Sequence, residues 1–266
     1  MFVKASCFPY RIGGKAASAC LILAAAISLS ACQTTGTSSR GADPVTTGST
    51  TPAPSLKATA AAAKAWRRNP RDLRAGMAYA SQLKALGQTG QQLAVLKQLV
   101  SYHPKDMSLR AFYGRALLKA GRPIQAEGVF RAMIKAGQRD WKTYNALGAA
   151  LAEQGRYGEA RAQYRAALRA SPGNPKITNN IAMSLILEGN PGRAETMLRQ
   201  AMATPQGARE PRLRQNLALA LGLQGRFKEA RYVASQDLSP AEVEANMAYL
   251  RRMLGSANTW DKLKKG

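Results

Sequence analysis

The sequence predicts an all-α protein in which helical hairpins stack one on the next into a superhelical solenoid. Three observations favour this fold class. Gly87, Gly121, Gly155 and Gly189 are each 34 residues apart, and a fixed period of this length is typical of stacked hairpin units. From about residue 56 the chain is rich in Ala and Leu, with apolar residues at helical spacing. Apolar residues make up 45% of the chain and charged residues 20%, as in ordinary folded proteins.

Charge and composition exclude several classes of function. The 266 residues include 39 Lys and Arg against 15 Asp and Glu, a formal net charge of +24, with one His and three Cys. A mean hydropathy of −0.28 argues against several membrane spans. The single His all but excludes a His-based metal site, and the sequence contains no glycine-rich phosphate loop and no Ser/His/Asp combination. We therefore expect no enzyme activity, no catalytic or metal-binding residues and no cofactor.

Residues 1–31 have the features of an export signal. A basic start is followed by an uncharged stretch over residues 16–29, which is short for a membrane span. The stretch ends in Leu-Ser-Ala-Cys, which resembles the lipobox of bacterial lipoproteins, so Cys32 is the expected lipidation site. Gln33 after the cysteine suggests the periplasmic face of the outer membrane. A plain secretory signal with a chance cysteine, or an uncleaved anchor, is the alternative.

Residues 32–55 predict a flexible linker behind the lipidated N-terminus. Thr, Ser, Gly and Pro dominate the segment, and almost no large apolar side chain is present. Such a composition cannot bury enough surface to offset the entropy of ordering. A tether of this length reaches roughly 25–30 Å on average, which would hold the folded part away from the membrane.

Residues 56–238 are predicted to form the repeat array. Its clearest unit spans residues 141–174 and resembles the tetratricopeptide repeat, with small residues where two helices approach and large residues that fill the next groove. The matching residues are Tyr144, Leu147, Gly148, Leu151, Ala160, Tyr164, Ala167 and Pro172. Within the array, residues 57–68 resemble half a unit ahead of the first full one, with Ala58, Ala62 and Ala65 at second-helix positions. The last unit is displaced by two residues.

A capping helix is expected over residues 239–254, followed by a tail at 255–266. Ser239 and Glu242 have the spacing of a capping box, with Pro240 between them as the first helical residue. One apolar stripe would cover the last repeat and leave a polar face outside. The stripe consists of Val243, Met247, Leu250 and Leu254.

The first helices of the hairpins carry the candidate binding residues. In a solenoid of this kind these helices line the concave face. Counting Trp141 as position one, position two is cationic in four of five units, and position five is an amide in the last three. Amides can bond a peptide backbone, and cations attract its carboxylates. The candidate groove residues are Arg74, Arg115, Lys142, Asn145, Lys176, Asn179, Arg212 and Gln215.

Two other interpretations of the charged residues stay open. The 36 basic residues beyond the signal peptide (39 minus three) could place cations on every face without forming a groove. The acidic residues Glu153, Glu159, Glu188 and Glu229 lie near helix ends beside arginines, and we expect surface ion pairs there. Export argues against a nucleic-acid partner.

The closing stretch at residues 234–254, ASQDLSPAEVEANMAYLRRML, together with the lipoprotein signal and the repeats, resembles the TadD family of the Flp/Tad (tight adherence) pilus assembly system. The resemblance implies a non-enzymatic outer-membrane protein that acts like a pilotin. Its partner would be a secretin subunit or another pilus-assembly protein. A generic periplasmic scaffold that recruits cell-wall or other envelope proteins is the first alternative, and a charge-driven binder of polyanions or cell wall is the second.

Overall fold

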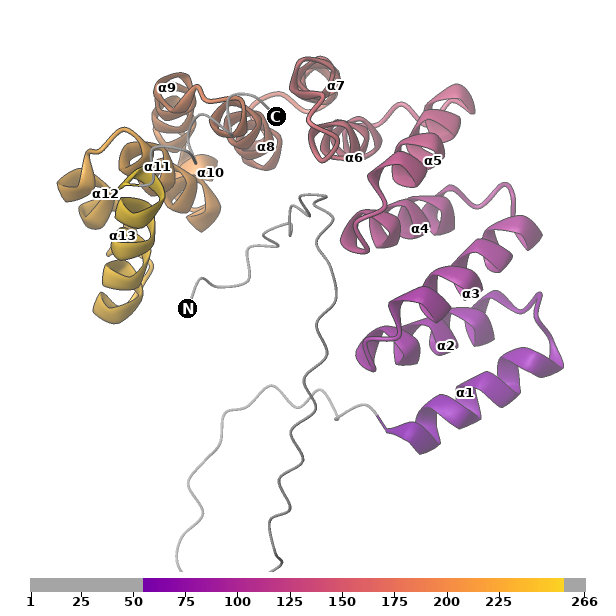
Figure 1. Ribbon diagram of the computed structural model, residues 1–266. Coiled ribbons are helices and arrows are strands. Elements are labelled where there is room, and N and C mark those ends of the chain that lie inside the picture. The colour runs from indigo at the N-terminus through magenta and orange to yellow at the C-terminus, as the bar shows by residue number, and fades with distance from the viewer. Residues whose placement is uncertain (1–54, 256–266) are drawn as a thin grey trace, which may run out of the picture. The chain divides into compact units, whose positions relative to one another are not determined.

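The computed structural model describes residues 55–255, and within this range it contains thirteen α-helices and no strand (Figure 1). The predicted signal peptide, Cys32, all but the last residue of the predicted linker, and residues 256–266 lie outside the described residues. The helices are α1 (Leu56–Arg68), α2 (Leu73–Ala85), α3 (Thr89–Tyr102), α4 (Met107–Lys119), α5 (Pro123–Lys135), α6 (Trp141–Ala152), α7 (Tyr157–Ala170), α8 (Pro175–Leu187), α9 (Pro191–Met202), α10 (Pro205–Ala208), α11 (Pro211–Leu223), α12 (Phe227–Ala234) and α13 (Pro240–Gly255).

Five hairpins follow one another along the chain: α2–α3, α4–α5, α6–α7, α8–α9 and α11–α12. Their first helices begin at residues 73, 107, 141, 175 and 211, which confirms the predicted period and its two-residue displacement in the last unit. The repeat glycines take the backbone conformation that ends a helix. The φ angle of Gly87 is 71° and that of Gly155 is 75°, a region that favours glycine because it has no Cβ.

Side chains at the helix starts also follow the period. Asp72, Asp106, Asp140 and Asn174 are spaced by 34 residues and precede the first four first helices. Each accepts a hydrogen bond from a backbone N–H of the first turn, for example from Lys142 N to Asp140 Oδ1 at 2.8 Å. These caps satisfy donors that would otherwise lack partners, and they were not predicted from the sequence.

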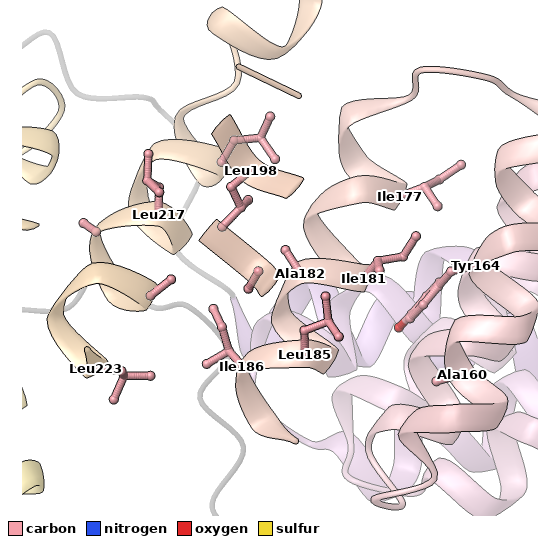
Figure 2. Close-up of a cluster of buried hydrophobic side chains, with 14 of the residues drawn as sticks. Ala160, Tyr164, Ile177, Ile181, Ala182, Leu185, Ile186, Leu198, Leu217 and Leu223 are labelled. Atoms are coloured by element: carbon pink, nitrogen blue, oxygen red, sulfur yellow. The ribbon is translucent and has the colours of Figure 1, made fainter. Parts of the chain in front are cut away.

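Small residues allow the helices of one hairpin to approach closely. A Cβ placed on Gly148 would lie 2.5 Å from Cε1 of Tyr164, and one on Gly114 would lie 2.6 Å from Cζ of Phe130. The two rings are buried, and the apolar core continues from hairpin to hairpin (Figure 2). Figure 2 shows Tyr164 of α7 beside Ile177 and other buried residues of α8. This packing agrees with the predicted roles of the small and large repeat positions.

The first helices form a row, since α4 contacts α6, α6 contacts α8, and α8 contacts α11. The second helices pack less closely on one another: no pair of them is among the extensive helix contacts of residues 55–255, and α5 meets α7 through the ion pair of Arg131 with Glu159. The exposed side of α2, α4, α6, α8 and α11 is called the first-helix face below.

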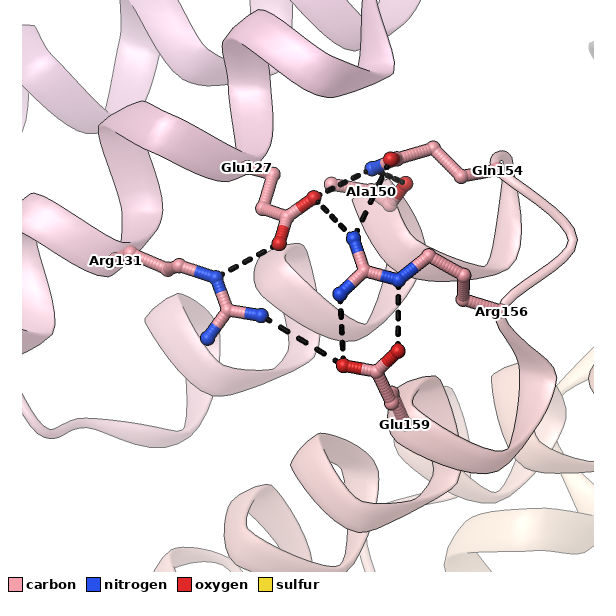
Figure 3. A network of polar contacts seen from close by, with 6 residues as sticks. All are labelled: Glu127, Arg131, Ala150, Gln154, Arg156 and Glu159. Atoms are coloured by element: carbon pink, nitrogen blue, oxygen red, sulfur yellow. Dashed lines mark hydrogen bonds and ion pairs between the residues drawn. The ribbon is translucent and has the colours of Figure 1, made fainter.

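Ion pairs join the outer ends of neighbouring hairpins (Figure 3). Glu127 of α5 accepts a hydrogen bond from Arg131 Nε of the same helix at 2.7 Å. Across the joint it accepts from Gln154 Nε2 at 2.8 Å and Arg156 Nη1 at 2.7 Å, both in the connection between α6 and α7. Arg156 also forms a two-bond ion pair with Glu159. Partial burial raises the pKa of Glu127, but bonds from Gln154 and Arg131 outweigh it, so the pKa lies below its usual 4.5.

The same network recurs two repeats later between α9 and α12. There Glu195 accepts from Arg226 Nη1 at 2.6 Å, and Arg226 forms a two-bond pair with Glu229. At the joint between α7 and α8–α9, an arginine, Arg161, has the repeat position that the acid Glu127 has one repeat earlier. Arg161 pairs there with the acid Glu188 at 2.7 Å. The predicted pairs of Glu159, Glu188 and Glu229 are confirmed.

Both ends of the array differ from its interior. Ser239 and Glu242 form the expected capping box, with Ser239 N donating to Glu242 Oε2 at 3.0 Å. Of the predicted stripe, Val243, Met247 and Leu250 are buried and Leu254 is partly buried. The helix α13 packs on α11 and α12, as a capping helix should.

At the other end, α1 packs on α2 as a half unit, but its predicted register is wrong. Ala63 is buried, whereas Ala58 and Ala65 are exposed and Ala62 is intermediate. Because no described helix precedes α1, only its side toward α2 is covered. No helix within residues 55–255 is long and apolar enough to cross a membrane.

Candidate functional site

The position-two residues lie along one edge of the first-helix face. Each is the second residue of its helix and each is exposed: Arg74, Ser108, Lys142, Lys176 and Arg212. A cation near a helix N-terminus does not stabilise the helix, because the macrodipole is positive at that end. Asp or Asn caps already occupy first-turn N–H groups at the starts of α2, α4, α6 and α8, so the cationic side chains, and not the helix ends, are the groups that attract anions at this edge. The position-two cations therefore contribute more to binding an anionic partner than to stabilising their own helices.

A pocket of about 480 Å³ opens on the same side between α4 and α6. It brings together Arg115 and Lys142, two of the predicted groove residues, with Ser108 and Ala111 also on its wall. The Nζ atom of Lys142 lies 5.9 Å from the ring centroid of Trp141, which lines the pocket as well. The pocket thus combines two cations, the carboxylate of Asp140 and apolar wall atoms. Asp140 is already bonded to Gln138, Lys142 N and Thr143, and the surplus of one positive charge can still attract an acidic side chain.

Asparagines connect three first helices beside this edge. Asn180 Nδ2 of α8 donates to Asn145 Oδ1 of α6 at 2.9 Å, and Asn216 Nδ2 of α11 donates to Asn179 Oδ1 of α8 at 2.7 Å. All four side chains are half-buried. These bonds occupy the carbonyls of Asn145 and Asn179, which leaves the Nδ2 donors of Asn145 without a bond to any residue in 55–255. The four residues are called the asparagine ladder below.

The structure places the eight predicted residues in three groups. Arg115 and Lys142 meet at the pocket, and Asn145 and Asn179 belong to the ladder. Arg74, Lys176, Arg212 and Gln215 are exposed at their predicted positions, outside both the pocket and the ladder. Gln215 precedes its ladder neighbour Asn216 by one residue.

Sequence reasoning missed Asn180 and Asn216. Both are at position six of their repeats, directly after a position-five amide. The pairs Asn179–Asn180 and Gln215–Asn216 were a usable signal, because adjacent amides on one helix can reach the helices on both sides.

One acidic residue at the C-terminal end of α6, Glu153, does not form the ion pair that was expected. Glu153 follows the last residue of α6, and its Oε2 atom is buried without a hydrogen-bond partner. Burial raises the pKa of Glu153 from 4.5 to about 7. The prediction of a surface pair is wrong here because the side chain turns inward, as its effect on the buried Tyr164 hydroxyl indicates.

Comparisons with known proteins define the class. Residues 114–175, 151–210 and 211–234 match models of the tetratricopeptide repeat. With the hairpin geometry described above, the fold is a tetratricopeptide-repeat solenoid, and solenoids of this class are protein-binding scaffolds without an indicated catalytic function.

Solved structures share this fold at low identity. TTC0263, a thermophilic TPR protein of Thermus thermophilus, has a TM-score of 0.53 and 22% identity, covering 69% of this chain and 97% of its own. A tetratricopeptide repeat protein from Parabacteroides merdae has a TM-score of 0.59 and 15% identity, covering 73% and 76%. PilW, described as a widely conserved type IV pilus biogenesis factor, has a TM-score of 0.55 and 18% identity, covering 78% and 89%. No curated protein matches the sequence.

Proposed function

We propose that the protein is a lipid-anchored adaptor that binds a peptide segment of a partner protein on its first-helix face. The observation that carries this proposal is the row of exposed cations at the helix N-termini beside the asparagine ladder. The ladder holds amide groups in fixed positions, where open donors can bond the backbone of an extended or helical peptide. The cations favour a segment that carries Asp or Glu.

The proposed partner is a secretin subunit, and the proposed process is assembly of the Flp/Tad pilus at the outer membrane in a pilotin-like role. Two observations support this choice. The stretch at residues 234–254 resembles the TadD family, and PilW, described as a type IV pilus biogenesis factor, has a similar fold. Cys32 would carry the lipid. Anchoring by acyl chains becomes stable with two or more of them, since each buried methylene adds about 0.8 kcal/mol.

A crosslinking experiment tests the face. The full chain is expressed with the double change Lys142→Glu and Lys176→Glu, envelopes are crosslinked, and the secretin recovered with the protein is measured by immunoblot. The matched control carries Lys135→Glu and Arg165→Glu, two exposed cations on the second helices α5 and α7. We expect recovery to fall at least about tenfold in the first variant, because like charges now face the segment, and to stay near wild type in the control.

Each other outcome contradicts the proposal in its own way. Equal recovery with wild type and the first variant would place the binding surface elsewhere. An equal loss in both variants would indicate that net charge alone drives association, as a polyanion binder would behave.

A second experiment tests the anchor. Changing Cys32 to Ser should leave the helical fold unchanged, as circular dichroism of the purified chain would report, and should move the protein out of the membrane fraction. Secretin multimers should decrease in the same cells. Normal secretin assembly without membrane attachment would contradict a pilotin-like role.

A further inference from the structure

The second-helix side of the solenoid contains a pocket that the proposed peptide groove does not use. It lies between α3 and α5, has α4 behind it, and measures about 670 Å³. Its wall includes three cations and no carboxylate. The polar side chains that could contact a ligand are Lys97, Arg110, Tyr113, Arg122 and Gln125. This cavity is called the α3–α5 pocket below.

Arg122 lacks partners that the same repeat position has elsewhere. Arg156 follows it by 34 residues and binds Glu127 and Glu159 (Figure 3). The residues 34 positions before those two acids are Leu93 and Gln125, so neither can neutralise Arg122. Both of them line the α3–α5 pocket with it. This joint between hairpins therefore has the arginine of the network without its acids.

Arg110 also lacks the acidic partner that an arginine at the same place in another repeat has. It is the fourth residue of α4, as Arg214 is the fourth residue of α11. Arg214 forms a two-bond ion pair with Asp237, which lies 23 residues further on. The residue 23 positions after Arg110 is the buried Met133. The Nε atom of Arg110 is buried and has no hydrogen-bond partner.

The three cations make no ion pair with any residue in 55–255. A buried arginine N–H without an acceptor destabilises the fold, so the array bears a cost here that the joints of Arg156 and Arg226 avoid. Burial raises the pKa of Tyr113, and the charge of Arg122 opposes this, which agrees with the placement of the two groups in one pocket. The Tyr113 hydroxyl adds a neutral donor.

We propose that the α3–α5 pocket binds a phosphate monoester. A phosphate monoester carries about −1.5 to −2 charges and three acceptor oxygens at neutral pH, and arginine forks match it in geometry. A single carboxylate would leave most of the positive charge of Lys97, Arg110 and Arg122 unopposed. Leu93, Val100 and Val129 on the wall provide contacts for the carbon part of the ester. The same chemistry occurs in soluble phosphate esters and in a lipid headgroup such as that of phosphatidic acid.

Calorimetric titration of the full chain tests the pocket. The probes are inorganic phosphate, glycerol 3-phosphate, and vesicles of phosphatidylcholine with and without phosphatidic acid. Arg110→Gln and Arg122→Gln should each weaken binding at least about tenfold, because each removes a charge-assisted bond. The matched control is Arg165→Gln, an exposed arginine that has the repeat position of Lys97 two repeats later and lies outside the pocket. It should change the affinity less than about twofold, as expected of an exposed charge.

A variant that gives Arg122 an ion-pair partner distinguishes binding in the α3–α5 pocket from attraction by the overall positive charge of the protein. Gln125→Glu restores the acid that Arg156 and Arg226 have at this position, so it should occupy Arg122, raise the melting temperature and weaken phosphate binding. Binding of glycerol 3-phosphate would identify a soluble ester, whereas binding only of phosphatidic acid vesicles would identify a lipid. Failure of every probe, or equal losses in Arg165→Gln and the pocket variants, would overturn the proposal.

Discussion

Glu153 gives the sharpest test of how the solenoid responds to pH. Its Oε2 atom is buried without a partner, and its pKa is about 7 instead of 4.5 because of that burial. A rise of this size corresponds to about 3 kcal/mol at 1.36 kcal/mol for each factor of ten. Water reaches the half-buried side chain, so we expect about 1–2 kcal/mol in practice.

The direction follows from proton binding in the two states. Between pH 4.5 and about 7 the folded protein holds a proton on Glu153 that the unfolded chain has released. The stabilising contribution of the protonated Glu153 is therefore fully present below pH 4.5 and is lost as the pH rises through about 7. Glu153→Gln removes the charge at every pH, so its free energy of unfolding should exceed that of wild type by about 1–2 kcal/mol at about pH 8. The difference should vanish near pH 4.

Urea denaturation at a series of pH values measures this difference. Glu242→Gln is the matched control, because the pKa of Glu242 is lowered by its bonds with Ser239. That variant should lose stability at neutral pH and approach wild type in acid, the opposite dependence. A Glu153→Gln curve parallel to wild type over the whole range would refute the argument that burial of this carboxylate destabilises the fold.

Further predictions concern the packing of the helices and the ion pairs at the hairpin joints. Gly148→Ala should lower the free energy of unfolding by about 1–2 kcal/mol, because its Cβ would lie 2.5 Å from the Tyr164 ring. Gly128→Ala, at a helical position with open space, should raise it by about 0.5–1 kcal/mol in the same denaturation assay. Glu127→Gln should cost about 1–3 kcal/mol, since two arginine bonds to a largely buried carboxylate are weakened. The equivalent change at Glu195 should cost a similar amount, and a double variant measured by urea titration should show additive losses. A double variant that costs much less than the sum would show that the two networks are coupled.

Most of the fold could be predicted from local signals. The period, the positive φ at Gly155, the Ser239–Glu242 capping box and the small residue at Gly148 all depend on neighbours a few residues away or on one repeated unit. The helix α1 was predicted as a helix but in the wrong register, because the buried side of an end helix depends on which neighbours cover it. The position-two residues are second in their helices because the helix starts follow the predicted period; their role in binding stays a prediction.

The candidate site was predicted only in part. Asn145 and Asn179 were identified by position, but their partners Asn180 and Asn216 lie on other helices, 35 and 37 residues away. The inward turn of Glu153 had no signal in the sequence, because the nearby arginines suggested an ordinary surface pair.

The sequence by itself determined that this chain is a stack of helical hairpins, because a repeated pattern of small, large and glycine positions leaves one way to bury the apolar residues. Only the tertiary structure decided which charged side chains form ion pairs and which have no partner. Arg156 finds Glu127 across 29 residues, while Arg122, at the same place in its own repeat, faces Leu93 and Gln125. Pairing of charges depends on contacts between hairpins, where one substitution in a neighbouring repeat changes an ion pair into an open cation.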